Sequence, residues 1–502
     1  MKTYFCIGIR LILTHGLCVL CCFGGFNCLP CNHLGLKADD VVRNVAFFRT
    51  ERSKRNVEHP RLSFNVYMDP SFTSLPNGSE IKVVLFRYLR YYKKGSGSLF
   101  CALGCKKLKH CGPVTVPSEH LNSCRLPSDI NYTELGSPVY SGGFLLYLAA
   151  KRTRKCTNAN ILGYSSHCQQ EMITDRPTAG FINFCLSPSD NLYDLSHVGF
   201  SPSLYAFFRD YNGIPLTPRQ PESGIYKWSE RVIRTKVRNW SSAIGTFQRK
   251  VHMVVTPTVL RFAREYFSCP YLEGVELENQ GDTGVSLSHW EMRILGNELM
   301  TATYTNVFRL SNLTLAFLED TGWYLPNYSL AEHLTWGAQR GCVFSTESCY
   351  SYIKADTAPF CLTPQDERSG NLFVCTPGQR MTLAPNVTDS LRMYTYFGNT
   401  SRLKYRGKVI PYDYFGKVDL ADFCPFVQVC CIRSLKLYKL KFVHETLTNW
   451  NNYNLEVYGP NSICLPISPN WILLGRKSTV YEAPVRGAGC YKVNSLAHAS
   501  KL

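Results

Sequence analysis

The sequence predicts a mixed α+β fold with several subdomains, on the basis of three observations. The chain has 502 residues, 45% of them hydrophobic, which can bury a large core in about three domains of roughly 150 residues. Short runs of alternating apolar and polar residues between Leu62 and Leu89 predict β-strands. Between Thr256 and Phe267, Pro257 precedes apolar residues at helical spacing, which predicts a helix with proline in its first turn.

The composition favours a secreted or cell-surface protein. Only 18% of the residues are charged while apolar residues are plentiful, which excludes wholesale disorder. The net charge of +18 is compatible with a nucleic-acid partner. The 23 cysteines argue against that partner, because their C-x2-C pairs, Cys18/Cys21 and Cys28/Cys31, crowd into an apolar leader and do not resemble a zinc finger. We therefore expect no nucleic-acid partner.

Both ends of the chain carry possible sorting signals. Lys2 and Arg10 precede an apolar run, 11–26, that is short and broken by glycine, which predicts a signal peptide over residues 1–30. A retained anchor is the alternative. The C-terminal Ser500-Lys501-Leu502 spells a peroxisomal address. It conflicts with the other secretory features, so we interpret it as coincidental, and no later apolar stretch gives strong support for a membrane span.

A basic run, Arg52-Ser-Lys-Arg55, has the R-x-K-R form that secretory convertases cut. Cleavage after Arg55 would define a short propeptide over residues 31–55 and start the mature chain at Asn56. A chance basic cluster is the alternative. Seven N-x-S/T sequons are further predicted to be glycosylated surface sites: Asn77, Asn131, Asn239, Asn312, Asn327, Asn386 and Asn399.

The cysteines beyond the leader fall into sequence groups. Without Cys31 they number 17, so one is a free thiol, forms an intermolecular bond or reflects an irregularity in the sequence. The grouping predicts locally stapled loops, each disulfide stabilising the fold by about 2–4 kcal/mol.

Three long stretches resemble the leishmanolysin family of surface zinc metallopeptidases, in matching order and spacing over roughly residues 60–430. They are Cys111–Cys185, Gly199–Arg219 and Gly274–Cys342, the last with the motifs Ser288-His-Trp-Glu291, Asn297-Glu-Leu-Met300 and Phe317-Leu-Glu-Asp-Thr-Gly-Trp-Tyr324. The resemblance implies metzincin-like subdomains: an N-terminal catalytic one (56–205), a central one (206–305) and a cysteine-rich, disulfide-rich C-terminal domain (306–502).

The resemblance also implies one catalytic Zn²⁺ and hydrolysis of peptide bonds in extracellular protein or peptide substrates. In H-E-x-x-H, two histidines on one helical face bind zinc and the glutamate acts as general base. His289 matches the family's third zinc ligand, and Met300 matches the methionine turn beneath the metal. Cys31 resembles the propeptide cysteine switch; a leader cysteine that pairs elsewhere is the alternative.

The chain departs from the family where H-E-x-x-H belongs. Residues 191–198 read Asn-Leu-Tyr-Asp-Leu-Ser-His-Val, with one histidine, His197, placed one residue too close to Gly199. We interpret His197 as a metal ligand of a distorted site and can name no general base. His444-Glu445 is no substitute, because Thr448 stands four residues after that histidine. Loss of a general base typically costs about 10²–10⁴-fold in rate, so we expect impaired peptidase activity.

Two other functions stay open at this point. The first is an inactive pseudo-peptidase that binds protein partners as a secreted or surface scaffold. The second is contact with a polyanion or the cell surface, suggested by the net charge and by the basic run from Arg231 to Arg238. Zinc stoichiometry distinguishes the peptidase from the scaffold, and salt-sensitive heparin binding tests the polyanion hypothesis.

Overall fold

The computed structural model describes part of the chain. The described residues are 32–33, 41–47, 64–74, 89–91, 99–101, 109–121, 143–157, 161, 163–185, 199–218, 227–243, 245–281, 284–302, 309–353, 359–360, 373–375, 404–405, 408–409, 418–424, 426–429, 462–466, 470–474, 480–484 and 488–492. Helices and strands are both present, which confirms the predicted α+β class. None of the helices in these ranges is long and apolar enough to cross a membrane.

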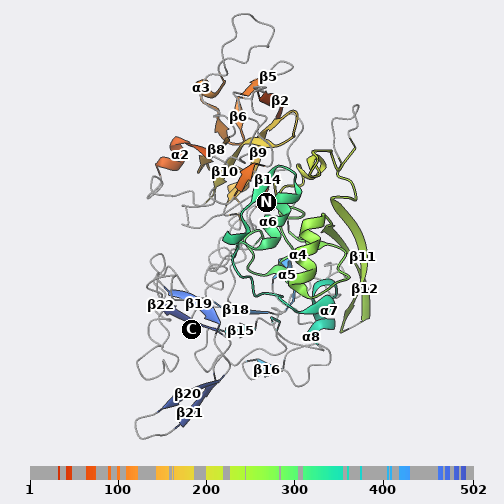
Figure 1. The fold of residues 1–502 in the computed structure, drawn as a ribbon. Helices are drawn as coiled ribbons and strands as arrows, with labels where there is room; N and C mark the ends of the chain where they lie inside the picture. Colours follow the sequence, from red (N-terminus) through yellow and green to blue (C-terminus); the bar gives the residue numbers. More distant parts are fainter. Residues whose placement is uncertain are drawn as a thin grey trace, which may run out of the picture.

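A seven-stranded mixed sheet forms the N-terminal part of the fold (Figure 1). The strand order is β3, β8, β10, β9, β2, β5, and β1 also pairs with β9. Strands β3, β8 and β10 are parallel, β9 is antiparallel to β10, β1 and β2 are parallel to β9, and β5 is antiparallel to β2. The bounds are β1 (Asn32–His33), β2 (Val42–Phe47), β3 (Phe64–Met68), β5 (Leu99–Cys101), β8 (Phe144–Ala149), β9 (Gly163–Glu171) and β10 (Pro177–Phe184).

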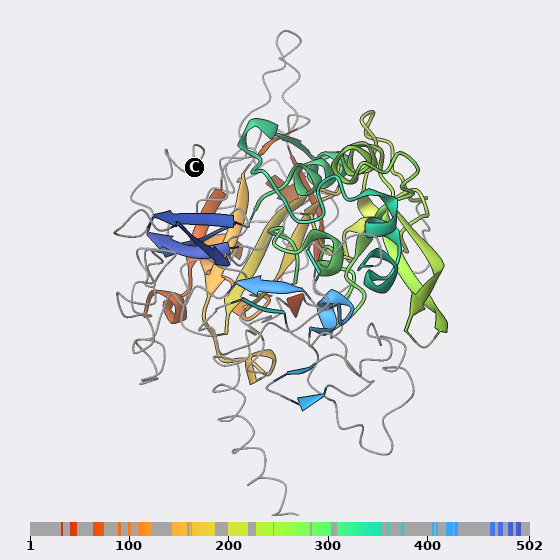
Figure 2. The same ribbon diagram turned by 90° about the horizontal axis from the view of Figure 1, so that it is seen from below.

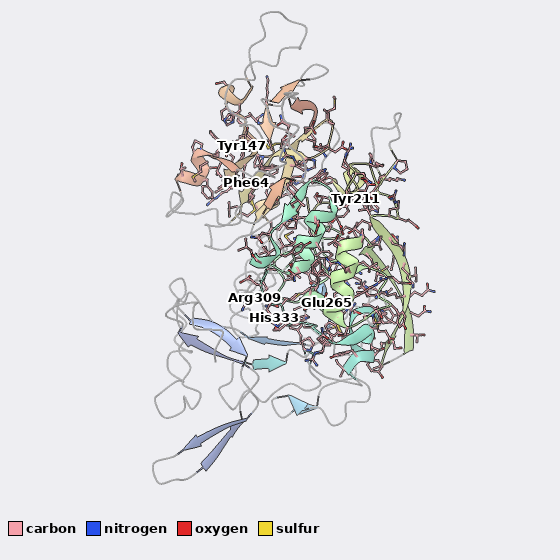
Figure 3. All side chains as sticks on the ribbon, viewed as in Figure 1. Phe64, Tyr147, Tyr211, Glu265, Arg309 and His333 are labelled. Atoms are coloured by element: carbon pink, nitrogen blue, oxygen red, sulfur yellow. A yellow bond between two sulfur atoms is a disulfide. The ribbon has the colours of Figure 1, made fainter. Side chains whose placement is uncertain are left out.

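Strand β8 shows why this sheet needs cover on both faces. All six of its side chains are buried. Because successive side chains in a strand point to opposite faces, Leu146 and Leu148 enter the larger hydrophobic core while Leu145 and Tyr147 enter a smaller one. Figure 3 labels Tyr147 within this sheet, near Phe64. A strand buried on both faces reads as a continuous apolar run rather than an alternating one.

The central part of the fold combines a three-stranded sheet with helices. β11 (Ile233–Ser242) and β12 (Gly245–Val254) form a long hairpin, and β13 (Val275–Leu277) pairs with β12. The hairpin lies at one side of the fold in both views (Figures 1 and 2). Helix α4 (Pro257–Phe267) confirms the helix predicted from Pro257, which stands in its first turn. Its buried residues are Val259, Ala263 and Phe267, whereas Glu265 is exposed on the other side (Figure 3).

Helix α6 (Asn312–Asp320) packs against α4. The carboxylate of Asp320 accepts hydrogen bonds from the backbone N–H groups of Thr258 and Val259, both at 2.9 Å. The end of α6 therefore caps the start of α4. Asp320 accepts from two N–H groups in the first turn of α4, which have no partner within that helix. The larger core runs on through all three predicted subdomains, and their boundaries stay predictions.

The remaining elements are short and connect or flank these parts. They are α2 (Pro70–Thr73), β4 (Leu89–Tyr91), β6 (His110–Cys111), β7 (Val114–Thr115), α3 (Ser118–Leu121), η3 (Lys155–Thr157), η4 (Tyr205–Phe207), α5 (Met292–Leu295), β14 (Tyr324–Pro326), η5 (Tyr328–Leu330), α7 (Gly341–Thr346), α8 (Cys349–Ile353), β15 (Phe373–Cys375), β16 (Lys404–Tyr405), β17 (Lys408–Val409), η8 (Asp419–Ala421), β18 (Val427–Val429), β19 (Ser462–Pro466), β20 (Asn470–Leu474), β21 (Val480–Pro484) and β22 (Ala488–Lys492).

The disulfides correct the expectation of locally stapled loops. Of the described bonds, Cys156–Cys185 joins one sequence group and spans 29 residues. The other three join cysteines of different groups over separations of 57, 73 and 75 residues: Cys111–Cys168, Cys269–Cys342 and Cys349–Cys424. Sequence proximity was a poor guide, because the elements that carry these cysteines pack together from distant parts of the chain.

Candidate functional site around His289

His289 lies in a buried layer of backbone formed by three segments. The residue that follows it, Trp290, forms an antiparallel bridge with Leu277 at the end of β13 and a parallel bridge with Thr301. The Trp290 N–H donates to the Met300 carbonyl at 2.9 Å, and the Glu278 N–H donates to the His289 carbonyl at 2.9 Å. The two residues predicted from the family motifs, His289 and Met300, are therefore on adjacent segments, and both side chains are buried.

The imidazole of His289 is held through Nδ1. This atom lies 3.1 Å from the carbonyl oxygen of Val285 and 3.2 Å from Oγ of Ser288. Ser288 Oγ itself donates to the carbonyls of Gly284 and Val285, at 3.0 and 2.9 Å. Since a carbonyl can only accept, we assign the proton to Nδ1, which leaves Nε2 as the basic nitrogen. That tautomer, oriented by a backbone carbonyl, is the form in which histidine binds metals.

Aromatic packing joins this layer to the segment after the missing motif. Phe200, fully buried, stacks on Phe317 with ring centroids 4.3 Å apart and meets Trp290 edge-on at 4.9 Å. The indole N–H of Trp290 donates to Thr314 Oγ1 at 2.9 Å. Phe200 follows the expected position of H-E-x-x-H in the sequence. Its ring therefore packs against the segment that carries His289.

Glu298 organises the turn at Met300, a role the sequence did not reveal. Its carboxylate accepts from the Met300 N–H at 2.5 Å, from the Ser311 N–H and hydroxyl at 3.1 and 2.7 Å, and from the Thr314 hydroxyl at 2.5 Å. Burial raises the pKa of Glu298, and these four hydrogen bonds act in the opposite direction. An acidic residue directly before the apolar pair Leu299-Met300 was the available signal for such a buried role.

A cluster of buried charges lies beside this layer. Arg293 is fully buried; it donates to Glu276 at 3.0 Å and to Asp422 at 3.3 Å, and it packs over the ring of Trp240. Arg238 also pairs with Glu276, and Arg249 with Asp422. These contacts join β11, β12, β13 and α5 to Asp422, which directly follows η8, so the cluster connects the central part of the fold to the segment at 418–424.

Two further carboxyl groups of this cluster, Glu278 and Glu291, are fully buried. Oε1 of Glu278 accepts from the Gln280 N–H at 2.9 Å and Oε1 of Glu291 from the Arg293 N–H at 3.0 Å. Their Oε2 atoms have no hydrogen-bond partner among the described residues. Burial raises the pKa of both groups well above its ordinary value, and the nearby charge of Asp422 raises both further. Both carboxyls are therefore neutral over a wider pH range than exposed ones.

The basic run on β11 is only partly a surface feature. Arg231 and Arg234 are exposed, but Lys236 pairs with Glu273 at 2.6 Å and Arg238 is buried in the charge cluster. The run thus does not present a continuous basic surface. Polyanion contact stays an untested prediction.

The structure describes some of the other predicted site residues. Asn239, Asn312 and Asn327 are exposed, as a glycosylation site requires. His197, Cys31, Arg55 and the sequons at Asn77, Asn131, Asn386 and Asn399 lie outside the described residues. His333, labelled near Arg309 in Figure 3, is exposed.

Comparison with known proteins gives the family. Residues 106–499 match the family model of the leishmanolysin peptidases. The chain belongs to the leishmanolysin family. It is 37% identical over 432 residues to a leishmanolysin-like peptidase of Caenorhabditis elegans, covering 76% of this chain and 63% of the relative. It is 36% identical over 443 residues to one of Drosophila pseudoobscura pseudoobscura, covering 79% and 64%.

A more distant relative is the ciliated left-right organizer metallopeptidase of Xenopus laevis, 32% identical over 256 residues, which are 47% of this chain and 33% of the relative. The chain spans less than two thirds of the length of each of these three relatives. The names of the first two relatives describe peptidases and that of the third a metallopeptidase, and membership in the leishmanolysin family implies zinc in general.

The residues that the structure describes do not by themselves complete a catalytic zinc site. His289 fits a zinc ligand, since its Nδ1 is held by a carbonyl and Nε2 is the basic nitrogen. Within the described residues, however, no three His, Cys, Asp or Glu side chains gather in a way that could hold a metal ion. Residues 186–198 add one histidine, and a catalytic zinc normally has three protein ligands. We therefore derive no catalytic step through zinc for this chain.

Proposed function

We propose that this chain is by family a zinc metalloendopeptidase of the leishmanolysin type, directed at extracellular proteins, in which zinc binding and peptide hydrolysis are both impaired. The observation that carries the proposal is the contrast between a packed His289–Met300 layer and residues 186–198, which lack H-E-x-x-H. The first supports a metzincin-like arrangement of third ligand and methionine turn. The second removes one histidine and the general base that the family mechanism requires.

Several features support a secretory route. The described disulfides form in oxidising compartments such as the secretory pathway. Three predicted glycosylation sites, Asn239, Asn312 and Asn327, are exposed. The substrates would then be proteins or peptides outside the cell.

Peptide cleavage by the purified protein tests the proposal. Cleavage of a mixture of unstructured peptides would be followed by mass spectrometry, with and without a zinc chelator. We expect cleavage at least about 10²–10⁴-fold slower than that of a family member with an intact motif, because the general base is missing and two histidines do not complete the zinc site. Chelator-sensitive cleavage at the rate of the intact relative would overturn the proposed impairment. In that case a residue other than the motif glutamate must supply the base.

A further inference from the structure

The predicted propeptide contributes an internal strand to the main sheet. β2 lies between β9 and β5 and pairs with both, with Val45 opposite Glu171 on one side and opposite Cys101 on the other. Upstream of β2, the short strand β1 also pairs with β9, with Asn32 opposite Tyr164 and His33 opposite Ser165. β1 therefore pairs near the start of β9 and β2 near its end, and both precede the predicted cleavage site at Arg55.

Strand β9 depends on this pairing because it is buried. Eight of its nine residues are buried, and its other edge is already used by β10. Buried backbone N–H and C=O groups must find partners, and leaving one unpaired costs free energy comparable to a lost hydrogen bond.

Strand β5 cannot replace β2. Neighbouring strands are about 4.8 Å apart, so without β2 the distance from β9 to β5 would be about 10 Å, beyond hydrogen-bonding reach. Loss of the N-terminal segment would therefore leave the outer edge of β9 unpaired and detach β5 from the sheet.

We propose that cleavage after Arg55 does not release the N-terminal segment: this segment stays attached to the sheet through β1 and β2, and the processed protein is a nicked molecule of two chains. The edge of β9 is then closed to an extended peptide from another molecule. This inference goes beyond the proposed function and holds whether or not the protein cleaves peptides.

Native size-exclusion chromatography of the cleaved protein tests the proposal. The precursor would be cut by a convertase specific for R-x-K-R, and the cut confirmed by mass spectrometry under denaturing conditions. A second version carries the recognition sequence of a site-specific protease inserted after Arg55, so that the cut does not depend on the convertase. The Cys31→Ser background removes the single cysteine between residues 31 and 55, so that any retention is non-covalent. We expect the fragment to co-elute with the main chain in a one-to-one ratio.

Matched variants in β2 show whether strand pairing retains the fragment. Val45→Pro removes a backbone N–H from the middle of an internal strand, whereas Val45→Thr keeps a residue that favours strands. We expect the fragment to dissociate after cleavage of Val45→Pro and to remain after cleavage of Val45→Thr. Retention in both variants would show that β2 pairing does not hold the fragment.

Hydrogen exchange keeps the proposal testable if Val45→Pro fails to fold. In the wild-type protein, the amides of β9 should exchange equally slowly before and after cleavage. Separate elution of the fragment, with faster exchange in β9, would overturn the proposal and show that processing opens this edge to another peptide.

Discussion

The candidate site has two sides, the His289–Met300 layer and residues 186–198, and only the first contains the residues expected from the family motifs. On one side, His289, Trp290 and Met300 are buried, and Glu298 accepts four hydrogen bonds that fix the turn. On the other side, residues 186–198 contain one histidine and no H-E-x-x-H. Phe200 nevertheless packs against Trp290 and Phe317. The difference teaches that the packing of this site does not depend on the residues that perform its chemistry.

The largest expected effect comes from restoring the motif in place. The substitutions Leu192→His, Tyr193→Glu and Ser196→His create H-E-x-x-H with two residues before Gly199-Phe200, the family spacing. The triple variant should cleave peptides at least about 10²–10⁴-fold faster than the unmodified chain, because the general base returns together with two zinc ligands. Quenched fluorescent peptides would measure the rate.

The matched control carries Tyr193→Gln in place of Tyr193→Glu, with the same two added histidines. It should bind zinc as the triple variant does but cleave about 10²–10⁴-fold more slowly, since glutamine cannot accept the proton. Equal rates for the two variants would mean that the restored glutamate is not the base. If neither variant binds zinc, His289 does not act as the third zinc ligand.

Removing the side chain of Arg293 should strongly lower the free energy of unfolding. Arg293→Ala leaves Glu276 and Asp422 buried with less compensation, which we expect to lower the free energy of unfolding by about 3–5 kcal/mol. Urea unfolding would measure the loss. Arg309→Ala is the control, because its pair with Glu332 is more than a third exposed on both sides and should contribute at most about 1 kcal/mol. Equal losses for the two variants would contradict a structural role for the charge cluster.

Removing the ring of Phe200, which packs against Trp290 and Phe317, should lower the free energy of unfolding by as much as the loss of Arg293 or by less. Phe200→Ala empties a fully buried position and should lower the free energy of unfolding by about 3–5 kcal/mol. Tyr211→Ala, at a side chain that is 72% exposed (Figure 3), should change it by less than about 0.5 kcal/mol. A small loss for Phe200→Ala would mean that the two sides are not packed together.

The smallest expected effect has the opposite sign and depends on pH. Burial raises the pKa of Glu291 in the folded state, so its contribution to stability is fully present below the ordinary value of about 4.5 and is lost as the pH rises toward the folded-state pKa. Glu291→Gln keeps an oxygen for the Arg293 N–H and removes the ionisation. It should stabilise the protein at pH 8, by less than the losses expected above, and change its stability little at pH 4. A loss of stability at pH 8 would show that the carboxylate is compensated there.

Local sequence signals predicted the elements that depend on neighbouring residues. Pro257 and the apolar spacing after it predicted α4, and the motifs around His289 and Met300 predicted segments that the fold brings together. The pairing of Cys269 with Cys342 could not be predicted in the same way, because it depends on which distant segments pack together.

The burial of the charged side chains could not be predicted from the sequence either, because it depends on contacts between distant segments. Arg238 belongs to the basic run that suggested contact with a polyanion, yet it is buried and pairs with Glu276 on β13. The place of residues 32–33 and 42–47 in the main sheet was missed as well, since a propeptide was expected to be separate from the fold. In each case the deciding contact lies far away in the sequence.

Zinc stoichiometry tests the central claim most directly. The protein would be purified without chelators, equilibrated with a slight excess of Zn²⁺, passed through a desalting column and analysed by inductively coupled plasma mass spectrometry, with His289→Ala measured in parallel. The account predicts far less than one tightly bound zinc per chain for both proteins, because two histidines do not complete a catalytic site. One tightly bound zinc per chain that is lost in His289→Ala would contradict it, and would mean that a ligand outside the family motif completes the site.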